Sequence, residues 1–265
     1  MARHANRTTQ QLIFLLILLI GVYGIAQKNG KRAYLHSKLR VTYVFPYLTV
    51  RQNQQIQPLD RKQVNSGPAG KFNLAITQLG DGNFILNGFF QSWKYFHDIR
   101  DQMKLEFRFS AATEQNCLRT LEQASGCVSI GVHLRRGDMT MKNDYEPASA
   151  EYFAEAVKWF RDKLSSAKCL HYLVVGDDIA WNLHNKPDAP KGSTITILPK
   201  NSIDHDLCVL AKSNHVVMSV GSYGWWGAYL SGGLVTYQKN FSKPNSGLRK
   251  MYNDEDFFLP EWTGL

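Results

Sequence analysis

Hydrophobic and polar positions alternate regularly from Val128 onward, and this pattern predicts strands separated by helices. Short apolar runs predict strands at 128–134, 170–176, 194–198, 215–220 and 234–237. Amphipathic segments predict helices at 149–165, 179–185, 204–213 and 224–231, the first of them with Ser149 as its N-cap. Strands that alternate with helices imply an α/β fold, a parallel sheet with helices on both faces.

The pattern before Val128 is weaker. Residues 27–72 are interpreted as a stem or linker, because the stretch RQNQQIQPLDRKQVNSGPAG is polar and contains proline and glycine. Order is expected from about residue 73, and residues 83–109 predict an apolar strand followed by an amphipathic helix. Residues 73–127 would then form a partial N-terminal half and residues 128–265 a complete Rossmann-like half.

The chain begins with a segment that favours a membrane. Leu12 to Ala26 carries no charge and lies between basic residues. The segment is shorter than the roughly 20 residues that span a bilayer, so a signal peptide cleaved after Ala26 is the alternative. A retained anchor at 12–26, with a cytoplasmic tail at 1–11, is the expectation. In either case the rest of the chain would be lumenal.

Four cysteines would lie in that oxidising space, and four cysteines allow three pairings into two disulfides. Cys117 and Cys127 flank a short polar turn, so this pair is the easiest to close. Cys169 and Cys208 fit equally well as buried free thiols. Asn240 begins an Asn-Phe-Ser sequon that could be glycosylated in the lumen.

The net charge of the 265-residue chain is +9, which permits an anionic partner. The basic residues do not form a block, and a secretory lumen holds no nucleic acid, so a nucleic-acid partner is not expected.

Unusual polar residues follow three of the predicted strands. The sequence HLRRGD ends the strand at 128–134, VGDD ends the strand at 170–176, and SVGSYGWWG leads into the helix at 224–231. Ligands of parallel α/β sheets bind at the carboxyl ends of the strands. These three segments therefore predict one ligand-binding rim.

Two adjacent arginines, Arg135 and Arg136, offer planar forks that match phosphate oxygens. The alternative is a structural role, in which they pair with Asp138 or with the end of a helix. A second alternative is that Arg136-Gly137-Asp138 is an exposed adhesion tripeptide.

Other rim residues suit a nucleotide. Gly221 and Gly224 free amide groups at a helix N-terminus, where an anion is favoured, and Ser222 adds a hydroxyl. Asp177 and Asp178 could accept from a guanine edge or a ribose diol, although Asp178 could equally cap a helix. His133 could stack on a base or simply be packed.

Metal is not expected. The pairs Asp204-x-Asp206 and Asp254-x-Asp256 have the spacing of metal-binding carboxylates, but the first lies in a helical pattern and the second near the C-terminus. Arginine could neutralise a diphosphate without a cation.

With these motifs the chain resembles the alpha-1,2-fucosyltransferases, glycosyltransferase family 11. The similarity covers most of the chain from Asn83 to Leu265. It rests on five blocks of sequence: VHLRRGD, VVGDDIAW, DLCVLAKSNHVVMSVGSYGWWGAYLSGG, NGFFQSWKYFHDIRDQMKLEF and FFLPEWTGL. The resemblance implies a Golgi type II membrane enzyme with a GT-B-like fold of two Rossmann-like halves. It would transfer fucose from GDP-fucose to a glycan galactose, with inversion and without metal.

The resemblance also implies roles for the rim residues. Arg135 would contact the β-phosphate, Arg136 and Asp138 would shape that site, and Arg135 and Asp138 are the candidate catalytic residues. The remaining donor-binding candidates are His133 for the guanine, Asp177 or Asp178 for the guanine or ribose, and Ser222, Tyr223 and Gly224 for the phosphates.

The chain departs from the family in one motif. The Gly-rich strand-to-helix turn G-R-L-G-N-x-x-F has no counterpart, so the first βα unit is expected to be missing or replaced. Three functions follow as hypotheses: an active fucosyltransferase, a non-catalytic membrane-tethered relative that binds the donor or a glycan, and an adhesion ligand.

Overall fold

The computed structural model describes residues 24–27, 34–35, 62–79 and 83–265. These residues form two compact units. The first unit contains the described residues up to Arg108 together with Lys250–Pro260, and the second contains Phe109–Arg249 together with Glu261–Leu265.

The second unit is built on a six-stranded sheet in the order β10-β9-β8-β5-β6-β7. Every neighbouring pair in this sheet is parallel. Its strands are β5 (Val128–Leu134), β6 (Leu170–Gly176), β7 (Ser193–Ile197), β8 (His215–Met218), β9 (Val235–Tyr237) and β10 (Thr263–Gly264). The α/β class with a parallel sheet is therefore confirmed.

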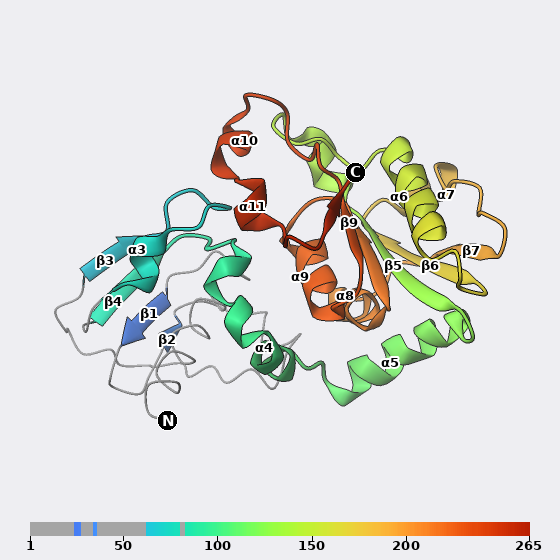
Figure 1. Ribbon diagram of the computed structural model, residues 1–265, viewed down its shortest axis with the longest axis horizontal. Coiled ribbons are helices and arrows are strands. Elements are labelled where there is room, and N and C mark those ends of the chain that lie inside the picture. Colours follow the sequence, from blue (N-terminus) through green and yellow to red (C-terminus); the bar gives the residue numbers. More distant parts are fainter. Residues whose placement is uncertain (1–23, 28–33, 36–61, 80–82) are drawn as a thin grey trace. The chain divides into compact units, whose positions relative to one another are not determined.

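Helices cover both faces of the sheet (Figure 1). They are α5 (Ala111–Leu121), α6 (Ala150–Lys163), α7 (Ile179–His184), α8 (Ile203–Lys212) and α9 (Ser222–Ser231), and the short helix α10 (Gly247–Met251) follows β9 in the chain. The chain leaves β5 through α6 toward β6, and it leaves β8 through α9 toward β9 on the other side. Because β5 and β8 are neighbours whose connections diverge, the sheet has a topological switch point between them, where α/β folds bind ligands.

The predicted elements from Val128 to Tyr237 all form, with bounds shifted by one or two residues in most of them. Ser149 caps α6 as expected, its side chain accepting from the N–H of Tyr152 at 3.1 Å. The largest change lies after β8, which ends at Met218 and not at residue 220. Gly221 has φ +94°, a conformation that favours glycine, and it turns the chain into α9.

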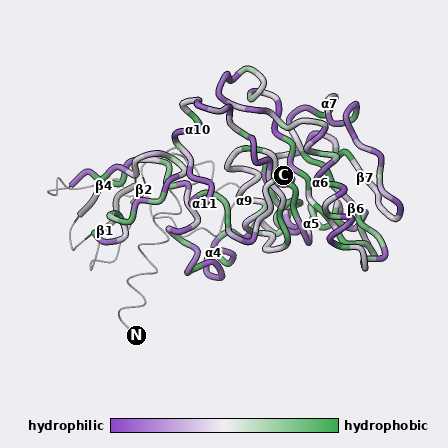
Figure 2. Tube along the Cα trace, turned by 45° about the horizontal axis from the view of Figure 1, so that its top comes forward, coloured by the Kyte–Doolittle hydropathy of each residue, from purple (hydrophilic) through white to green (hydrophobic). Residues whose placement is uncertain are grey.

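The core of the second unit lies between the sheet and α6. Its fully buried residues include Ile130, Val132, Phe153 and Phe160. In Figure 2 the hydrophobic stretches lie in the strands and helices inside the unit, and the connecting loops are mostly hydrophilic. This burial holds β5 and β6 rigid, so the loops that follow them start from fixed positions.

Helix α5 corrects two predictions made from the sequence. Residues 109–127 were expected in the N-terminal half, but α5 belongs to the second unit. Cys117 of α5 is bonded to Cys208 of α8, and Cys127 is bonded to Cys169. The expected Cys117–Cys127 pair and the alternative of free thiols at Cys169 and Cys208 are therefore wrong.

The physical reason is that α5 packs along α8. The hydroxyl of Thr113 donates to Asp204 at 2.6 Å, and Thr120 bonds the ring of His205 at 2.9 Å. These contacts hold α5 against α8 and bring together cysteines that are 91 positions apart.

The described part of the first unit contains a mixed sheet in the order β2-β1-β4-β3. Its strands are β1 (Gly24–Gln27), β2 (Tyr34–Leu35), β3 (Lys62–Asn65) and β4 (Asn83–Asn87). Its helices are α3 (Leu74–Thr77), the 3₁₀ turns η1 (Trp93–Tyr95) and η2 (His97–Ile99), α4 (Arg100–Glu106) and α11 (Asp254–Phe257).

The expected linker therefore ends before residue 62. β3 pairs in parallel with β4, and Ser66 and Ala69 are buried. The N–H of Phe72 donates to Asp256 at 3.0 Å. Long-range contacts order this polar segment, and composition does not reveal them.

Most of the predicted membrane anchor lies outside the described residues. Its last three positions, 24–26, are the exception, because they belong to β1, which pairs antiparallel with β4. In the part of the chain that the structure describes, there is no helix of the length and apolar character needed to cross a bilayer.

Candidate functional site

The loops that follow β5, β6 and β8 meet at the carboxyl edge of the sheet, at the switch point. The backbone N–H of Arg135, just after β5, donates to the hydroxyl of Ser219, just after β8, at 2.8 Å. The N–H groups of Arg136 and Gly137 donate to Asp177, just after β6, at 2.8 and 3.1 Å. The three predicted rim segments therefore come together.

Arg135 lies between two carboxylates. Its Nε donates to Oδ1 of Asp138 at 3.0 Å and lies 3.2 Å from Oδ2 of Asp177, and its Nη2 lies 2.8 Å from Asp138. Nη1 has no partner among the described residues, and the side chain is 37% exposed. The guanidinium is thus held along one edge by carboxylates, and the N–H groups of Nη1 remain available to bind an anion.

Asp138 completes this arrangement. Its second oxygen lies 2.7 Å from Nζ of Lys142. The hydrogen bond from Lys142 and the nearby Arg135 charge lower the pKa of Asp138, although its slight burial acts in the opposite direction. The carboxylate is therefore ionised at neutral pH and orients Arg135.

Asp177 fastens the loop after β5 to the end of β6. A Cβ on Gly137 would lie 2.7 Å from Oδ2 of Asp177, so this position has room only for glycine. Both Asp177 oxygens already have partners in the protein. The expectation that Asp177 pairs with a guanine or ribose is not favoured by this geometry.

Asp178 is a helix cap. Its Oδ1 accepts from the N–H of Trp181 at 3.0 Å at the start of α7. Its Oδ2 has no partner among the described residues, which leaves one oxygen for a ligand.

Arg136 has the structural role that was the alternative for it. Its guanidinium lies 4.0 Å above the ring of Trp181, and Nη1 bonds the carbonyl oxygen of Ala148. Asp138, the third residue of the RGD sequence, is paired with Arg135 and Lys142. Both charged residues of the tripeptide have partners within the chain, so this geometry does not favour the adhesion hypothesis.

His133 is the penultimate residue of β5, next to the rim. It is 4% exposed, and its Nδ1 is buried without a hydrogen-bond partner among the described residues. Burial, assisted by the charge of Arg135 and opposed by Asp177, lowers the pKa of His133 to about 4. The ring is therefore neutral at physiological pH.

Helix α9 closes the other side of the rim. A Cβ on Gly224 would lie 2.3 Å from Nδ1 of His133, and the ring of Tyr223 lies 5.3 Å from the ring of His133. The amide groups of the first turn of a helix have no partner within the helix and favour an anion. Ser222 and Tyr223 lie in this turn and are partly exposed.

The position of Tyr223 depends on α8. Its hydroxyl donates to the carbonyl oxygen of Ile203 at 2.6 Å, and burial raises its pKa above the usual value. Asp206 accepts from Asn201 at 3.1 Å and lies 3.1 Å from Nδ1 of His205. Burial raises the pKa of Asp206, although these two bonds oppose the shift.

The two Asp-x-Asp pairs therefore have other partners. Asp204 accepts from Thr113, Asp206 from Asn201, and Asp256 from Lys94 at 2.6 Å. Among the described residues, three or more potential ligands do not gather in any place where they could hold a metal ion.

Sequence reasoning missed two supporting residues of the rim. Ser219 is 1% exposed and holds the backbone of Arg135, and Trp181 carries Arg136. Ser219 is the first residue of the quoted motif SVGSYGWWG and Trp181 the last of VVGDDIAW, and this position within the motifs is the only signal that could have indicated them.

The switch point thus places an open guanidinium edge beside a helix N-terminus in an α/β sheet, an arrangement that can bind the phosphates of a nucleotide. The family model described as "Glycosyl transferase family 11" matches residues 59–265. The chain belongs to glycosyltransferase family 11.

Curated relatives agree with this assignment. The chain is 31% identical over 260 residues to "Galactoside alpha-(1,2)-fucosyltransferase 1" of Saimiri sciureus, covering 91% of this chain and 69% of the relative. It is 30% identical over 260 residues to the protein of the same name from Saimiri boliviensis boliviensis, with the same coverage.

Solved structures give a weaker similarity. POFUT1 in complex with GDP aligns with a TM-score of 0.35 at 13% identity, covering 53% of this chain and 49% of that one. A mutant of Arabidopsis thaliana FUT1 in complex with GDP gives 0.37 at 10% identity, covering 71% and 54%.

Proposed function

We propose that this chain is a galactoside alpha-1,2-fucosyltransferase, which transfers fucose from GDP-fucose to the galactose of a glycan with inversion. The observation that carries the proposal is the geometry of Arg135. Its guanidinium is fixed by Asp138 and Asp177 on one edge and open on the other, at the switch point of the sheet.

The reaction needs a fixed positive charge in that place. A hydroxyl oxygen of the acceptor forms a bond to C1 of fucose, while the bond between C1 and the β-phosphate oxygen breaks. The electron pair of that bond stays on GDP, and the hydroxyl gives up its proton. Negative charge therefore grows on the β-phosphate, and a preorganised guanidinium stabilises it more than the ground state.

The neighbouring groups suit the rest of the donor. The first-turn amide groups of α9, with Ser222, Tyr223 and Gly224, would bind phosphate oxygens. His133, neutral and almost fully buried, would support the guanine side of the site. Oδ2 of Asp178 would accept from the ribose or the base.

Two measurements test the proposal. Isothermal titration of the full chain with GDP should show saturable binding, and incubation with GDP-fucose and lactose should release GDP and form fucosylated lactose. Absence of both GDP binding and transfer would overturn it.

A catalytically impaired relative is the second candidate, favoured by the departure of the chain from the family's Gly-rich sequence G-R-L-G-N-x-x-F. The structure does contain a strand-to-helix turn between β3 and α3, with Gly67 at φ +77° and Gly70, but α3 has only four residues. Transfer requires the acceptor in line with the donor, and a misplacement of about 1 Å can cost on the order of 100-fold. Saturable GDP binding with slow or absent transfer would support this candidate.

We further propose a metal-independent reaction, since arginine and helix amides supply the positive charge. Transfer should be unchanged by EDTA and should not be stimulated by manganese. Loss of transfer in EDTA, with recovery on added manganese, would contradict this proposal.

The proposed location is the Golgi membrane, with the uncharged segment from Leu12 up to the start of β1 as a type II anchor and the catalytic portion in the lumen. Two disulfides suit an oxidising lumen. Asn240 is exposed in a turn, where a glycan can be attached. A mobility shift on glycosidase treatment, absent in Asn240→Gln, tests the orientation, and N-terminal sequencing distinguishes the anchor from a cleaved signal.

A further inference from the structure

The outer face of α6 carries a hollow that lies apart from the donor rim. It has a volume of about 480 Å³ and is lined by Glu155, Lys158, Trp159, Asp162, Lys163 and Leu265. Ligand pockets have volumes of roughly 300–1,000 Å³, so the hollow is large enough for a small molecule.

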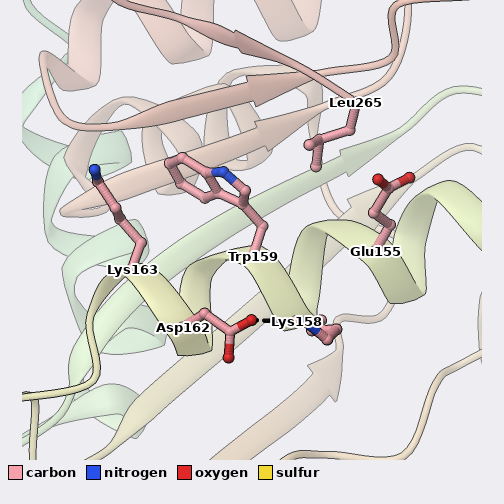
Figure 3. A pocket seen from close by; sticks show the side chains of 6 residues that line it. All are labelled: Glu155, Lys158, Trp159, Asp162, Lys163 and Leu265. Carbon is pink, nitrogen blue, oxygen red and sulfur yellow. Dashed lines mark hydrogen bonds and ion pairs between the residues drawn. The ribbon is translucent and has the colours of Figure 1, made fainter.

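The indole of Trp159 forms the floor of this hollow. Trp159 and Leu265 pack against the core, and the ring of Trp159 meets that of Phe160 edge-on at 4.9 Å. One side of the indole is thereby fixed. Figure 3 shows the ring between Lys163 on one side and Glu155 and Leu265 on the other.

Three polar groups around the indole have no internal partner. The Nε1–H of Trp159, the carboxylate of Glu155 and the ammonium of Lys163 make no hydrogen bond or ion pair with any described residue. Lys158 and Asp162, which also line the hollow, are by contrast paired with each other at 2.7 Å (Figure 3). The unpaired groups are four residues apart on α6, so they share one face.

The chemistry of these groups selects the ligand. Indole N–H and ammonium only donate, and a carboxylate only accepts, so a ligand that satisfies all three must do both. The two acidic and two basic side chains of the lining balance in charge, which disfavours a strongly charged ligand. An indole face is electron-rich and attracts weakly positive C–H groups. A sugar ring has a face of C–H groups and a rim of hydroxyls.

We propose that this hollow is a binding site for a neutral saccharide, stacked on Trp159 and hydrogen-bonded to Glu155 and Lys163. Resting on the proposed function, the ligand is an inner part of the galactose-terminated acceptor glycan. α6 starts at the rim, where the N–H of Ala148 donates to the carbonyl oxygen of Arg135 at 3.4 Å. Along the axis of α6, Glu155 lies about 8 Å and Lys163 about 20 Å from the start of the helix. A short glycan chain can cover either distance.

The test uses the full chain labelled with 5-fluorotryptophan. The fluorine resonance of Trp159 is assigned by its loss in Trp159→Phe. Lacto-N-tetraose, which ends in galactose, should shift this resonance saturably, and Glu155→Gln should weaken that binding about tenfold, as expected for a lost charge-assisted hydrogen bond. Glu151→Gln is the control, an exposed carboxylate of α6 that does not line the hollow.

Several outcomes decide the proposal. The proposal is overturned if the tetrasaccharide produces no shift, or if Glu155→Gln leaves the shift unchanged. It is also overturned if raising the protein concentration alone produces the shift, because a second copy of the chain would then occupy the hollow. If maltotetraose binds as tightly as lacto-N-tetraose, the hollow is still a saccharide site, but its proposed link to the acceptor glycan is overturned. Parallel titration with GDP reports on the donor rim, so a failure of the proposed function is recognised separately.

Kinetics gives a second readout where transfer is measurable. Glu155→Gln should raise KM for lacto-N-tetraose and leave kcat unchanged, because the site binds the acceptor far from the reacting atoms. KM for lactose, which is too short to reach the hollow, should stay the same.

Discussion

Oδ2 of Asp177 lies 3.2 Å from Nε of Arg135, although the two residues follow different strands. The same carboxylate accepts the N–H groups of Arg136 and Gly137. Asp177 therefore orients both the side chain of Arg135 and the loop that carries it, and does so without contacting the donor in our proposal.

Asp177 and its neighbour Asp178 should consequently differ in their effects. Asp177→Asn keeps an oxygen for the backbone but removes the charge beside Arg135, so we expect GDP affinity to fall about tenfold, in line with a charged hydrogen bond of roughly 1.5–3 kcal/mol. Asp178→Ala should cost about 1 kcal/mol of stability through the lost cap of α7. Titration calorimetry and urea unfolding separate the two. Equal loss of GDP affinity in both variants would contradict the assignment.

Arg135→Lys should reduce GDP binding and any transfer by roughly 10- to 100-fold, because an ammonium cannot bind Asp138 and present a fork to the phosphate at once. Arg136→Lys is the control. It should lower thermal stability through the lost contact with Trp181 and affect GDP less. Unchanged binding in Arg135→Lys would remove Arg135 from the donor site.

Gly224→Ala should displace His133, since the added Cβ would meet Nδ1 at 2.3 Å. We expect a loss of stability of about 1–3 kcal/mol from overpacking, together with weaker GDP binding. Ser222→Ala, in the same turn of α9, should leave stability nearly unchanged. A Gly224→Ala variant as stable as the parent would show that the His133 contact relaxes at no cost.

His133 should make the protein sensitive to acid. Its pKa is about 4 in the folded protein against 6.5 for a free histidine. Between these values the unfolded chain binds a proton that the folded chain does not, so the stability present above pH 6.5 is lost as pH falls toward 4. The loss is roughly 3 kcal/mol. Urea unfolding at pH 7 and pH 4 should show a smaller pH effect in His133→Gln, whatever that variant's stability at pH 7.

The disulfides should be Cys117–Cys208 and Cys127–Cys169, and non-reducing peptide mapping by mass spectrometry checks this directly. Replacing Cys117 and Cys208 by serine should lower the free energy of unfolding by about 4–5 kcal/mol, the value for a closed loop of nearly 100 residues. A mapped Cys117–Cys127 peptide would contradict the packing of α5 on α8.

The sequence predicts the second unit well for a physical reason. Its strands are buried on both faces and therefore read as continuous apolar runs, and caps such as Ser149 are local signals. The meeting of the loops after β5, β6 and β8 at one rim followed from the rule for parallel sheets. The different roles of Asp177 and Asp178 could not be predicted, because the two residues are adjacent and chemically identical and are distinguished by the backbone amides that they accept from.

Other features depend on contacts between distant residues. The order of residues 62–72 comes from pairing with β4 and from Asp256, which is 184 positions from Phe72. The cysteine pairing depends on the packing of α5 on α8. Local composition carries no trace of either, so the sequence pattern predicted a linker and a local disulfide.

The two disulfides are nested, since the segment between Cys127 and Cys169 lies entirely within that between Cys117 and Cys208. A chain that enters an oxidising compartment from its N-terminus presents Cys117 and Cys127 first, and the nearest available partner of Cys117 is the wrong one. The native outer bond can form only after α8 has entered, 91 residues later. In a host that oxidises cysteines in order of arrival, we therefore expect the mispaired form to accumulate unless thiol–disulfide isomerisation corrects it.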